Sequence, residues 1–173
     1  MGERYPGYMH LLIFWGFLIL AIGTFLVAVE DDVLRPLFNT GFLHGNFYVI
    51  FSFFLDLAGL AAIVGVAMAF VRRYVTRPER LDNKPEDLIT LIWILVVLVS
   101  GFLVEAARIA YDQPAFERFS FVGYFLSSFF LNLTKEGVKS YHVALWYGHM
   151  LLSFGLIAYI AYARLLHIIT SSL

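Results

Sequence analysis

Cysteine is absent from this sequence of 173 residues. Its absence excludes disulfides, iron–sulfur clusters, thiolate zinc sites and c-type haem attachment on this chain. Charge is scarce as well, since charged residues make up 14% of the chain, against about 25% in soluble domains. The net charge of −1 gives no excess of positive charge of the kind that nucleic-acid binding needs. A nucleic-acid partner is therefore not expected.

Apolar residues are abundant instead, with 61% hydrophobic residues and a mean hydropathy of +0.80. A soluble domain of this size buries only about 70% of its unfolded surface, so one core cannot hide this excess. The composition excludes a soluble globular enzyme and a disordered chain. It indicates an integral membrane protein.

Four stretches with no charge, or with one, are long enough to cross a hydrocarbon core of about 30 Å at about 1.5 Å per residue. We therefore predict an all-α integral membrane fold, a single domain over residues 1–173 with four transmembrane helices. The expected helices cover about 8–29, 45–72, 87–111 and 142–170. The first is too long for the apolar part of a signal peptide and lacks a small-residue cleavage site, so we expect it to be retained.

A fifth uncharged run, Phe119–Leu133, has 15 residues, which is short for a span. Pro114 and Gly123 interrupt the approach to it. We predict a short interfacial or re-entrant segment between the third and fourth helices. If it spanned, the fourth helix would run in the opposite direction.

Lysine and arginine set the expected orientation. With four spans, the face with both termini and the 72–87 loop carries seven of them, and the other face carries five. Because cytoplasmic loops are enriched in these residues, we expect both termini in the cytoplasm and a multi-pass protein of the cell inner (cytoplasmic) membrane.

Five histidines lie near the ends of the predicted helices: His10, His44, His142, His149 and His167. His149 and His167 are 18 residues apart, which is five whole helical turns, so both point the same way about 27 Å apart. His142 falls about 20° off the same stripe. Antiparallel helices place His10 at the level of His167. They place His44 near the level of His142 and His149.

Two levels of paired imidazole suit the axial ligation of haem iron in a helical bundle. A b-type haem needs no cysteine, whereas zinc prefers about four ligands at one place. An interfacial polar role remains the alternative for any single histidine. Six small residues would admit a flat macrocycle or, alternatively, ordinary helix packing. They are Gly16, Gly23, Ala58, Gly59, Ala61 and Gly65.

A family resemblance is carried by most of the chain, from Tyr8 to Thr170. The respiratory nitrate reductase gamma subunit, a cytochrome b with two haems, has a final helix that resembles HMLLSFGLIAYIAYARLLHIIT here. The membrane domain of heterodisulfide-reductase-like iron–sulfur oxidoreductases is more similar in HLLIFWGF, YVIFSFFLDLAGL, RRYVTRPERLDN and GFLVEAARIA. The resemblance implies a four-helix, haem-binding cytochrome b bundle that exchanges electrons between haem and a membrane quinone.

The resemblance assigns His10 and His167 to the cytoplasmic-side haem and His149 to the outer haem. The nitrate reductase pattern has a second histidine ten residues after the first on the first helix, and this chain has a leucine there. The outer haem then takes His44 as its other ligand, with His142 as the alternative. We expect two b haems, and one at minimum.

Other polar residues lie inside the spans. Glu105 and Arg108 either neutralise each other at i and i+3, or Arg108 binds a haem propionate and Glu105 accepts a quinol proton. Asp56 lies near mid-membrane, as a structural polar contact or as part of a proton path. Arg164, three residues before His167, is a cytoplasmic anchor or a second propionate partner.

A quinone site is expected between the outer haem level, Glu105 and the aromatic Phe119–Leu133 segment. The alternative is that this segment only seals the bundle as an interfacial amphipathic helix.

The predicted function is a membrane-anchoring cytochrome b subunit of a respiratory oxidoreductase complex, which is not catalytic alone. It would pass electrons between a quinone or menaquinone pool and a soluble iron–sulfur partner. Because this chain has no cysteine, that partner's cysteine-rich repeats would lie on another chain or on a part not included. The alternatives are a cofactor-free membrane anchor for a soluble enzyme and a small transporter or channel, for which Asp56 is the one supporting residue.

Overall fold

The computed structural model describes the backbone of residues 4–77, 85–112 and 115–171, and their side chains except at 115–116 and 163–171. These residues form helices and no strand. Four helices are long and apolar enough to cross a membrane: Arg4–Phe38, Gly45–Thr76, Pro85–Asp112 and Lys135–Tyr162. Helices satisfy every backbone polar group within one segment, which apolar spans require. The prediction of an all-α fold with four spanning helices is confirmed.

The first spanning helix continues beyond its predicted end near residue 29. Helix α1 (Arg4–Ala28) runs on through a π-helical turn (Val29–Leu34) into α2 (Arg35–Phe38), before Asn39 ends it in the left-handed conformation with φ of 49°. The acidic stretch stays helical because its carboxylates are paired. Arg35 forms an ion pair of 2.6 Å with Glu30 and one of 2.9 Å with Asp31.

The second and third spanning helices are joined by an ion pair near their connection. Helix α3 (Gly45–Phe70) continues through a π-helical turn (Val71–Thr76), and α4 spans Pro85–Asp112. Arg73 pairs with Asp87 in the first turn of α4. The carboxylate also lies where the positive end of the helix dipole favours it.

The last helix, α6 (Lys135–Ser171), begins seven residues before its predicted start at 142. Thr134 caps it, because its Oγ1 accepts a hydrogen bond of 3.2 Å from the Gly137 backbone N–H. Glu136 in the first turn adds a favourable interaction with the helix dipole. The prediction began the helix at the start of the uncharged run and therefore missed its charged first turns.

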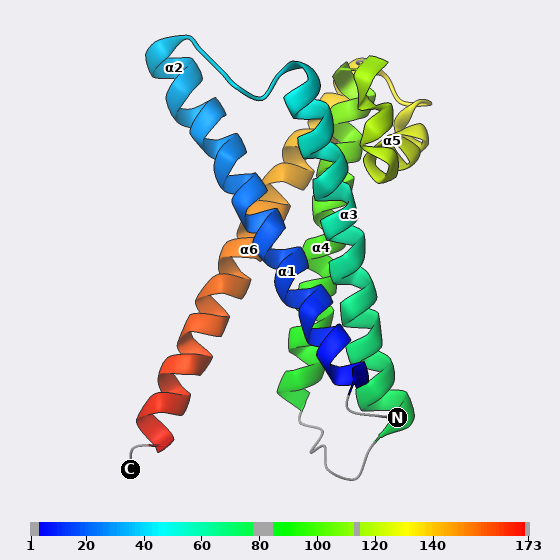
Figure 1. The fold of residues 1–173 in the computed structure, drawn as a ribbon. Helices are drawn as coiled ribbons and strands as arrows, with labels where there is room; N and C mark the ends of the chain where they lie inside the picture. Colours follow the sequence, from blue (N-terminus) through cyan, green and yellow to red (C-terminus); the bar gives the residue numbers. More distant parts are fainter. Residues whose placement is uncertain (1–3, 78–84, 113–114, 172–173) are drawn as a thin grey trace.

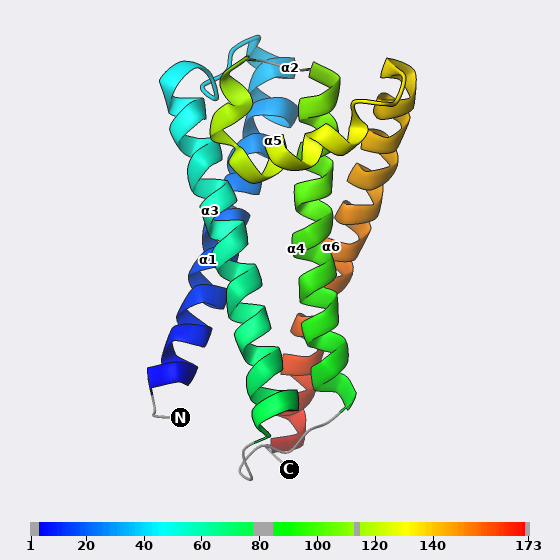
Figure 2. The ribbon, with the colours of Figure 1, turned by 90° about the vertical axis from the view of Figure 1, so that its right-hand side faces the viewer.

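The fifth apolar run does not span. It forms a 3₁₀ turn (Ala115–Phe119), the short helix α5 (Phe121–Ser127) and a second 3₁₀ turn (Ser128–Phe130). Figure 2 shows α5 crossing in front of α3 and α4 near one end of the bundle, as predicted for an interfacial segment. Both chain ends lie at the opposite end (Figure 1). We call the end formed by residues 29–48 and 105–139 the α5 end.

The helices pack as neighbouring pairs. Helix α1 packs along α3, α3 contacts α4, and α4 packs along α6. Figure 1 shows the lower end of α6 standing apart from the other helices on the left, while the lower end of α1 lies beside α3. Ala62, Val66 and Leu98 form the buried centre between α3 and α4.

Small residues serve ordinary helix packing at several of the predicted positions. A Cβ at Gly16 would lie 2.8 Å from the Ala58 carbonyl oxygen. A Cβ at Gly23, Gly59 or Gly65 would also come too close to side-chain or backbone atoms of a neighbouring helix.

Candidate functional site

A hydrogen-bonded polar network lies at the α5 end, where α3, α4 and the turn before α5 meet. Arg108 donates from Nη1 to Glu117 Oε1 at 2.6 Å and from Nη2 to the Tyr48 hydroxyl at 2.8 Å. Tyr48 donates to the same Glu117 oxygen at 2.9 Å, and Ser120 donates to Oε2 at 3.0 Å. Glu117 is 1% exposed. A carboxylate this deeply buried is stable because a cation and two hydroxyls satisfy it.

This network bears on the alternative that Glu105 and Arg108 neutralise each other. Arg108 forms its ion pair with Glu117 and not with Glu105, the residue at i−3. The charge of Arg108 is therefore largely neutralised by a residue that the sequence analysis did not consider.

Two further carboxyl groups, Asp56 and Glu105, face each other beneath α5. Asp56 is 1% exposed, and its Oδ2 accepts the Val122 backbone N–H at 2.6 Å. Its Oδ1 is buried and has no hydrogen-bond partner among the described residues. Glu105 interacts electrostatically with Asp56. A Cβ on Gly123 would lie only 2.7 Å from the Cδ of Glu105. Asp56 thus makes the polar contact that ties α3 to α5, and its place in a proton path stays a prediction.

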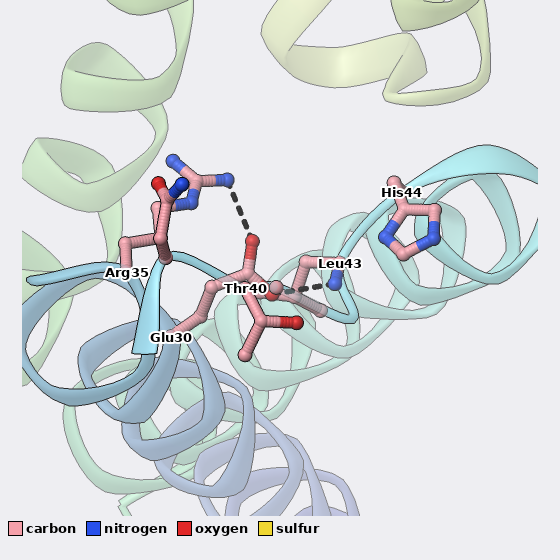
Figure 3. A pocket seen from close by; sticks show the side chains of 7 residues that line it. Glu30, Arg35, Thr40, Leu43 and His44 are labelled. Atoms are coloured by element: carbon pink, nitrogen blue, oxygen red, sulfur yellow. Dashed lines mark hydrogen bonds and ion pairs between the residues drawn. The ribbon is translucent and has the colours of Figure 1, made fainter. Parts of the chain in front are cut away.

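A second buried carboxylate, Glu30, fixes the loop before α3. It accepts backbone N–H groups of Phe42 and Leu43 at 2.8 and 2.5 Å, and Arg35 donates to it at 2.6 Å. Glu30 is 1% exposed, and all of its interactions are internal to the protein. Figure 3 shows it in a pocket with Arg35 and Thr40, while the exposed His44 stands at the edge. Glu30 therefore serves to hold this loop.

His149 is held against α4 through one ring nitrogen. Its Nδ1 lies 2.9 Å from Ser100 Oγ. Because that hydroxyl donates its proton to the Val97 carbonyl at 3.0 Å, we assign the ring proton to Nδ1, which donates to Ser100. The other nitrogen, Nε2, then keeps its lone pair, with the Ser153 hydroxyl 3.5 Å away.

The remaining predicted ligand residues lie at exposed or half-buried positions or outside the described side chains. His10 near the start of α1 and His44 before α3 are exposed, and His142 is half-buried. The side chains of Arg164 and His167 lie outside the described residues. Within the described part of the chain, no three histidine, aspartate or glutamate side chains cluster as a metal site would require. These ligand assignments stay predictions.

Comparison with known proteins decides the family. The sequence model of the nitrate reductase gamma subunit family matches residues 10–173. The chain belongs to this family. It is 34% identical over 177 residues to the EtfAB:quinone oxidoreductase of Syntrophomonas wolfei, covering 96% of this chain and 24% of the relative. It is 20% identical over 169 residues to the probable iron-sulfur-binding oxidoreductase FadF of Bacillus subtilis, covering 98% of this chain and 23% of FadF. No solved structure matches it.

Membership of the nitrate reductase gamma subunit family and two relatives named as oxidoreductases support a membrane subunit of an oxidoreductase. The chain spans about a quarter of the length of these relatives. The predicted likeness to this family and to the membrane part of iron–sulfur oxidoreductases is confirmed.

The b-type haem implied by the nitrate reductase gamma subunit family can be tested against His149. Metal-bound histidines usually donate their second ring N–H to a partner, which fixes the tautomer and leaves the other nitrogen for the metal. Ser100 provides this partner for Nδ1. His149 would therefore fit as a haem ligand through Nε2.

The sequence analysis missed four polar residues of the α5 end: Glu30, Tyr48, Glu117 and Ser120. A signal existed for Glu117, since it lies in the short aromatic segment AFERF, where a carboxylate needs a partner. Tyr48 is one of ten tyrosines, and nothing in the sequence distinguishes it.

Proposed function

We propose that this chain is the cytochrome b part of a respiratory oxidoreductase and exchanges electrons between a membrane quinone and an iron–sulfur partner. The family match over residues 10–173 is the observation that carries the proposal. One relative is named for EtfAB and quinone, and the other for iron–sulfur binding.

Haem b, when bound, supplies one-electron redox chemistry. His149 would hold one of two haems through Nε2, with His44 or alternatively His142 opposite it. His10 and His167 would hold the other. Ser100 orients the His149 ring, which supports this assignment. Because Arg108 is already paired with Glu117, its proposed role at a haem propionate loses support. Arg164 stays the proposed propionate partner at the level of the cytoplasmic-side haem.

The quinone site is proposed at the α5 end, beside Glu105. Helix α5 presents Phe121, Tyr124 and Phe125 as exposed aromatic side chains, which suit a quinone ring and its isoprenoid tail. Oxidation of a quinol releases two electrons and two protons. The Glu105 carboxylate accepts each proton in turn from a quinol O–H and passes it to water at this face. Both electrons leave toward the partner, and reduction of a quinone reverses each transfer.

The iron–sulfur partner is proposed to act at the opposite end of the bundle, in the cytoplasm. Three arginines lie in the π-helical turn after α3 or directly after it and precede the rest of a basic connection: Arg72, Arg73 and Arg77. This cluster supports an orientation with both termini inside and offers a surface for a soluble partner. The partner's clusters and cysteine-rich repeats would lie outside this sequence, which has no cysteine.

The test uses the purified full complex. A pyridine haemochrome spectrum should show b haem, and a quinol analogue should reduce it. Glu105→Gln should slow this reduction about 10²- to 10⁴-fold, the range of general acid–base catalysis, without loss of haem. The control is Glu136→Gln, which removes an exposed carboxylate in the first turn of α6. Absence of haem would instead favour the cofactor-free anchor, and unchanged kinetics would move the quinone site away from Glu105.

A further inference from the structure

We propose that Asp56 and Glu105 share one proton beneath α5 and form a proton-holding site between α3, α4 and α5. The existence of the site follows from the arrangement of these residues. Its use in quinone turnover rests on the proposed function. The sequence singled out Glu105 as the proton acceptor, and the structure adds Asp56 as the group with which it exchanges the proton.

The first argument is the number of charged groups that meet beneath helix α5. Three carboxyl groups, Asp56, Glu105 and Glu117, meet one guanidinium, that of Arg108. Glu117 takes this cation at 2.6 Å and is completed by Tyr48 and Ser120. Tyr48 also interacts with this cluster, and His142 and Asp112 lie toward Arg108. Asp56 and Glu105 therefore have no cation of their own among the described residues.

Two ionised carboxylates are strongly disfavoured at such a place. Asp56 is 1% exposed, and Glu105 is half-buried under α5. Like charges this close, in a medium with little water, cannot both stay ionised, so one proton is retained between them. A protonated carboxyl beside an ionised one forms a short O–H···O⁻ hydrogen bond, which is stronger than a bond between neutral groups.

The second argument is an unused acceptor. The Val122 N–H occupies Asp56 Oδ2, whereas Oδ1 is buried without a donor. A buried acceptor without a donor costs about 1–3 kcal/mol. A protonated Glu105 supplies the missing donor, and no other side chain needs to move to the site.

The third argument is the position of Gly123. A Cβ there would lie 2.7 Å from Glu105 Cδ and 2.8 Å from Oε2. Helix α5 therefore closes directly over the Glu105 carboxyl, and glycine is the residue that leaves room for it. The same helix supplies the Val122 N–H to Asp56. One short helix thus holds both carboxyl groups in place.

The experiment is infrared spectroscopy of the purified full complex without added quinone, in H₂O and in D₂O. A protonated carboxyl has a C=O stretching band that ionised carboxylates lack, and this band shifts on deuteration. The wild type should show it at neutral pH. Asp56→Asn and Glu105→Gln should each remove it, because the new amide donates to the remaining carboxylate and lets it ionise. Glu136→Gln should leave it unchanged.

The outcomes separate this site from the proposed function. Absence of the band in the wild type, its persistence in both variants, or its loss in only one of them would overturn the shared proton. A normal band together with unchanged quinol-driven haem reduction in Glu105→Gln would overturn the quinone site and leave the proton-holding site intact.

A second variant covers the case in which a carboxyl variant fails to fold. Gly123→Ala keeps both carboxyl groups but pushes the end of the Glu105 side chain aside. It should shift or weaken the band, whereas Gly148→Ala, where a Cβ meets nothing within 4 Å, should not. An unchanged band in folded Gly123→Ala would contradict the shared proton beneath α5.

Discussion

The two outer helices are attached to the bundle in different ways. Helix α1 meets α3 through small residues, since a Cβ on Gly16 would lie 2.8 Å from a backbone oxygen of α3. Helix α6 meets α4 through large and polar side chains. Trp93 donates from Nε1 to the Leu152 carbonyl at 3.0 Å and stacks on Tyr159 with ring centroids 5.7 Å apart. His149 joins the same interface through Ser100.

This difference separates a packing interface from a functional one. Close backbone approach through small residues is a common way to associate helices in lipid, where apolar burial gives no driving force between helices. Around Gly16 it also leaves no space between α1 and α3 for a cofactor. The interface of α4 and α6 carries His149, whose ring is held by Ser100 of the neighbouring helix. Changes in the α4–α6 interface should therefore affect cofactor binding, and changes in the α1–α3 interface should affect stability.

The largest expected effect is at the α4–α6 interface. His149→Ala should remove one b-type absorbance component from the purified complex, because the iron loses its axial nitrogen. Haem content and the reduced spectrum measure it. His142→Ala tests the alternative ligand, one histidine seven residues earlier on the same helix, and should retain that component if His44 is the opposite ligand. Full haem content in His149→Ala would refute the assignment.

The fold was largely predictable because apolar runs have the length that a bilayer demands. The number of spans and the interfacial segment were correct. The start of the second helix and both ends of the third were predicted to within two residues, whereas the end of the first and the start of the last were not, since these depend on local pairing. Arg35 keeps an acidic segment helical, and the Thr134 cap starts α6 among charged residues. A search of the sequence for N-cap residues would have found the start of α6 at Thr134, but not the helical extension held by Arg35.

The candidate site was only partly predictable. Glu105 and Asp56 stand out because a carboxylate inside a span is costly, and both lie together beneath α5. The partner of Arg108 was missed because Glu117 lies across a turn, and local i,i+3 spacing favoured Glu105. Contacts between distant elements, such as Tyr48 with Glu117, depend on how α3 and the 3₁₀ turn meet. No spacing along the chain encodes them.

A smaller effect is expected from the α1–α3 interface. In Gly16→Ala the new Cβ would meet a backbone oxygen and the Ala62 Cβ, both at 2.8 Å. Because backbone atoms cannot turn aside, the helices must separate, at a cost of about 1–3 kcal/mol. Unfolding of the detergent-solubilised protein by a denaturing detergent measures it. Gly148→Ala is the control, with open space around its Cβ. Equal stability of the two variants would show that α1 and α3 are not so closely packed, and unchanged haem content in Gly16→Ala would support the contrast between the interfaces.

The smallest effect is expected from Ser100→Ala, which leaves His149 in place but removes the acceptor of its Nδ1–H. Loss of such a partner typically weakens metal binding about 10- to 100-fold. We expect the lower end, about tenfold, because the Val97 carbonyl also lies within reach of the ring. The imidazole becomes a weaker donor to ferric iron, so the midpoint potential of that haem should rise.

A redox titration followed in the haem absorbance distinguishes this effect from general loosening of the helix pair. Ser100→Thr keeps the hydroxyl and should restore the wild-type potential. Ser153→Ala removes the hydroxyl 3.5 Å from the other ring nitrogen, a distance too long for a strong hydrogen bond, and should change little. If Ser153→Ala shifted the potential and Ser100→Ala did not, Nε2 would be the nitrogen held by the protein. The tautomer that makes His149 a haem ligand would then be wrong.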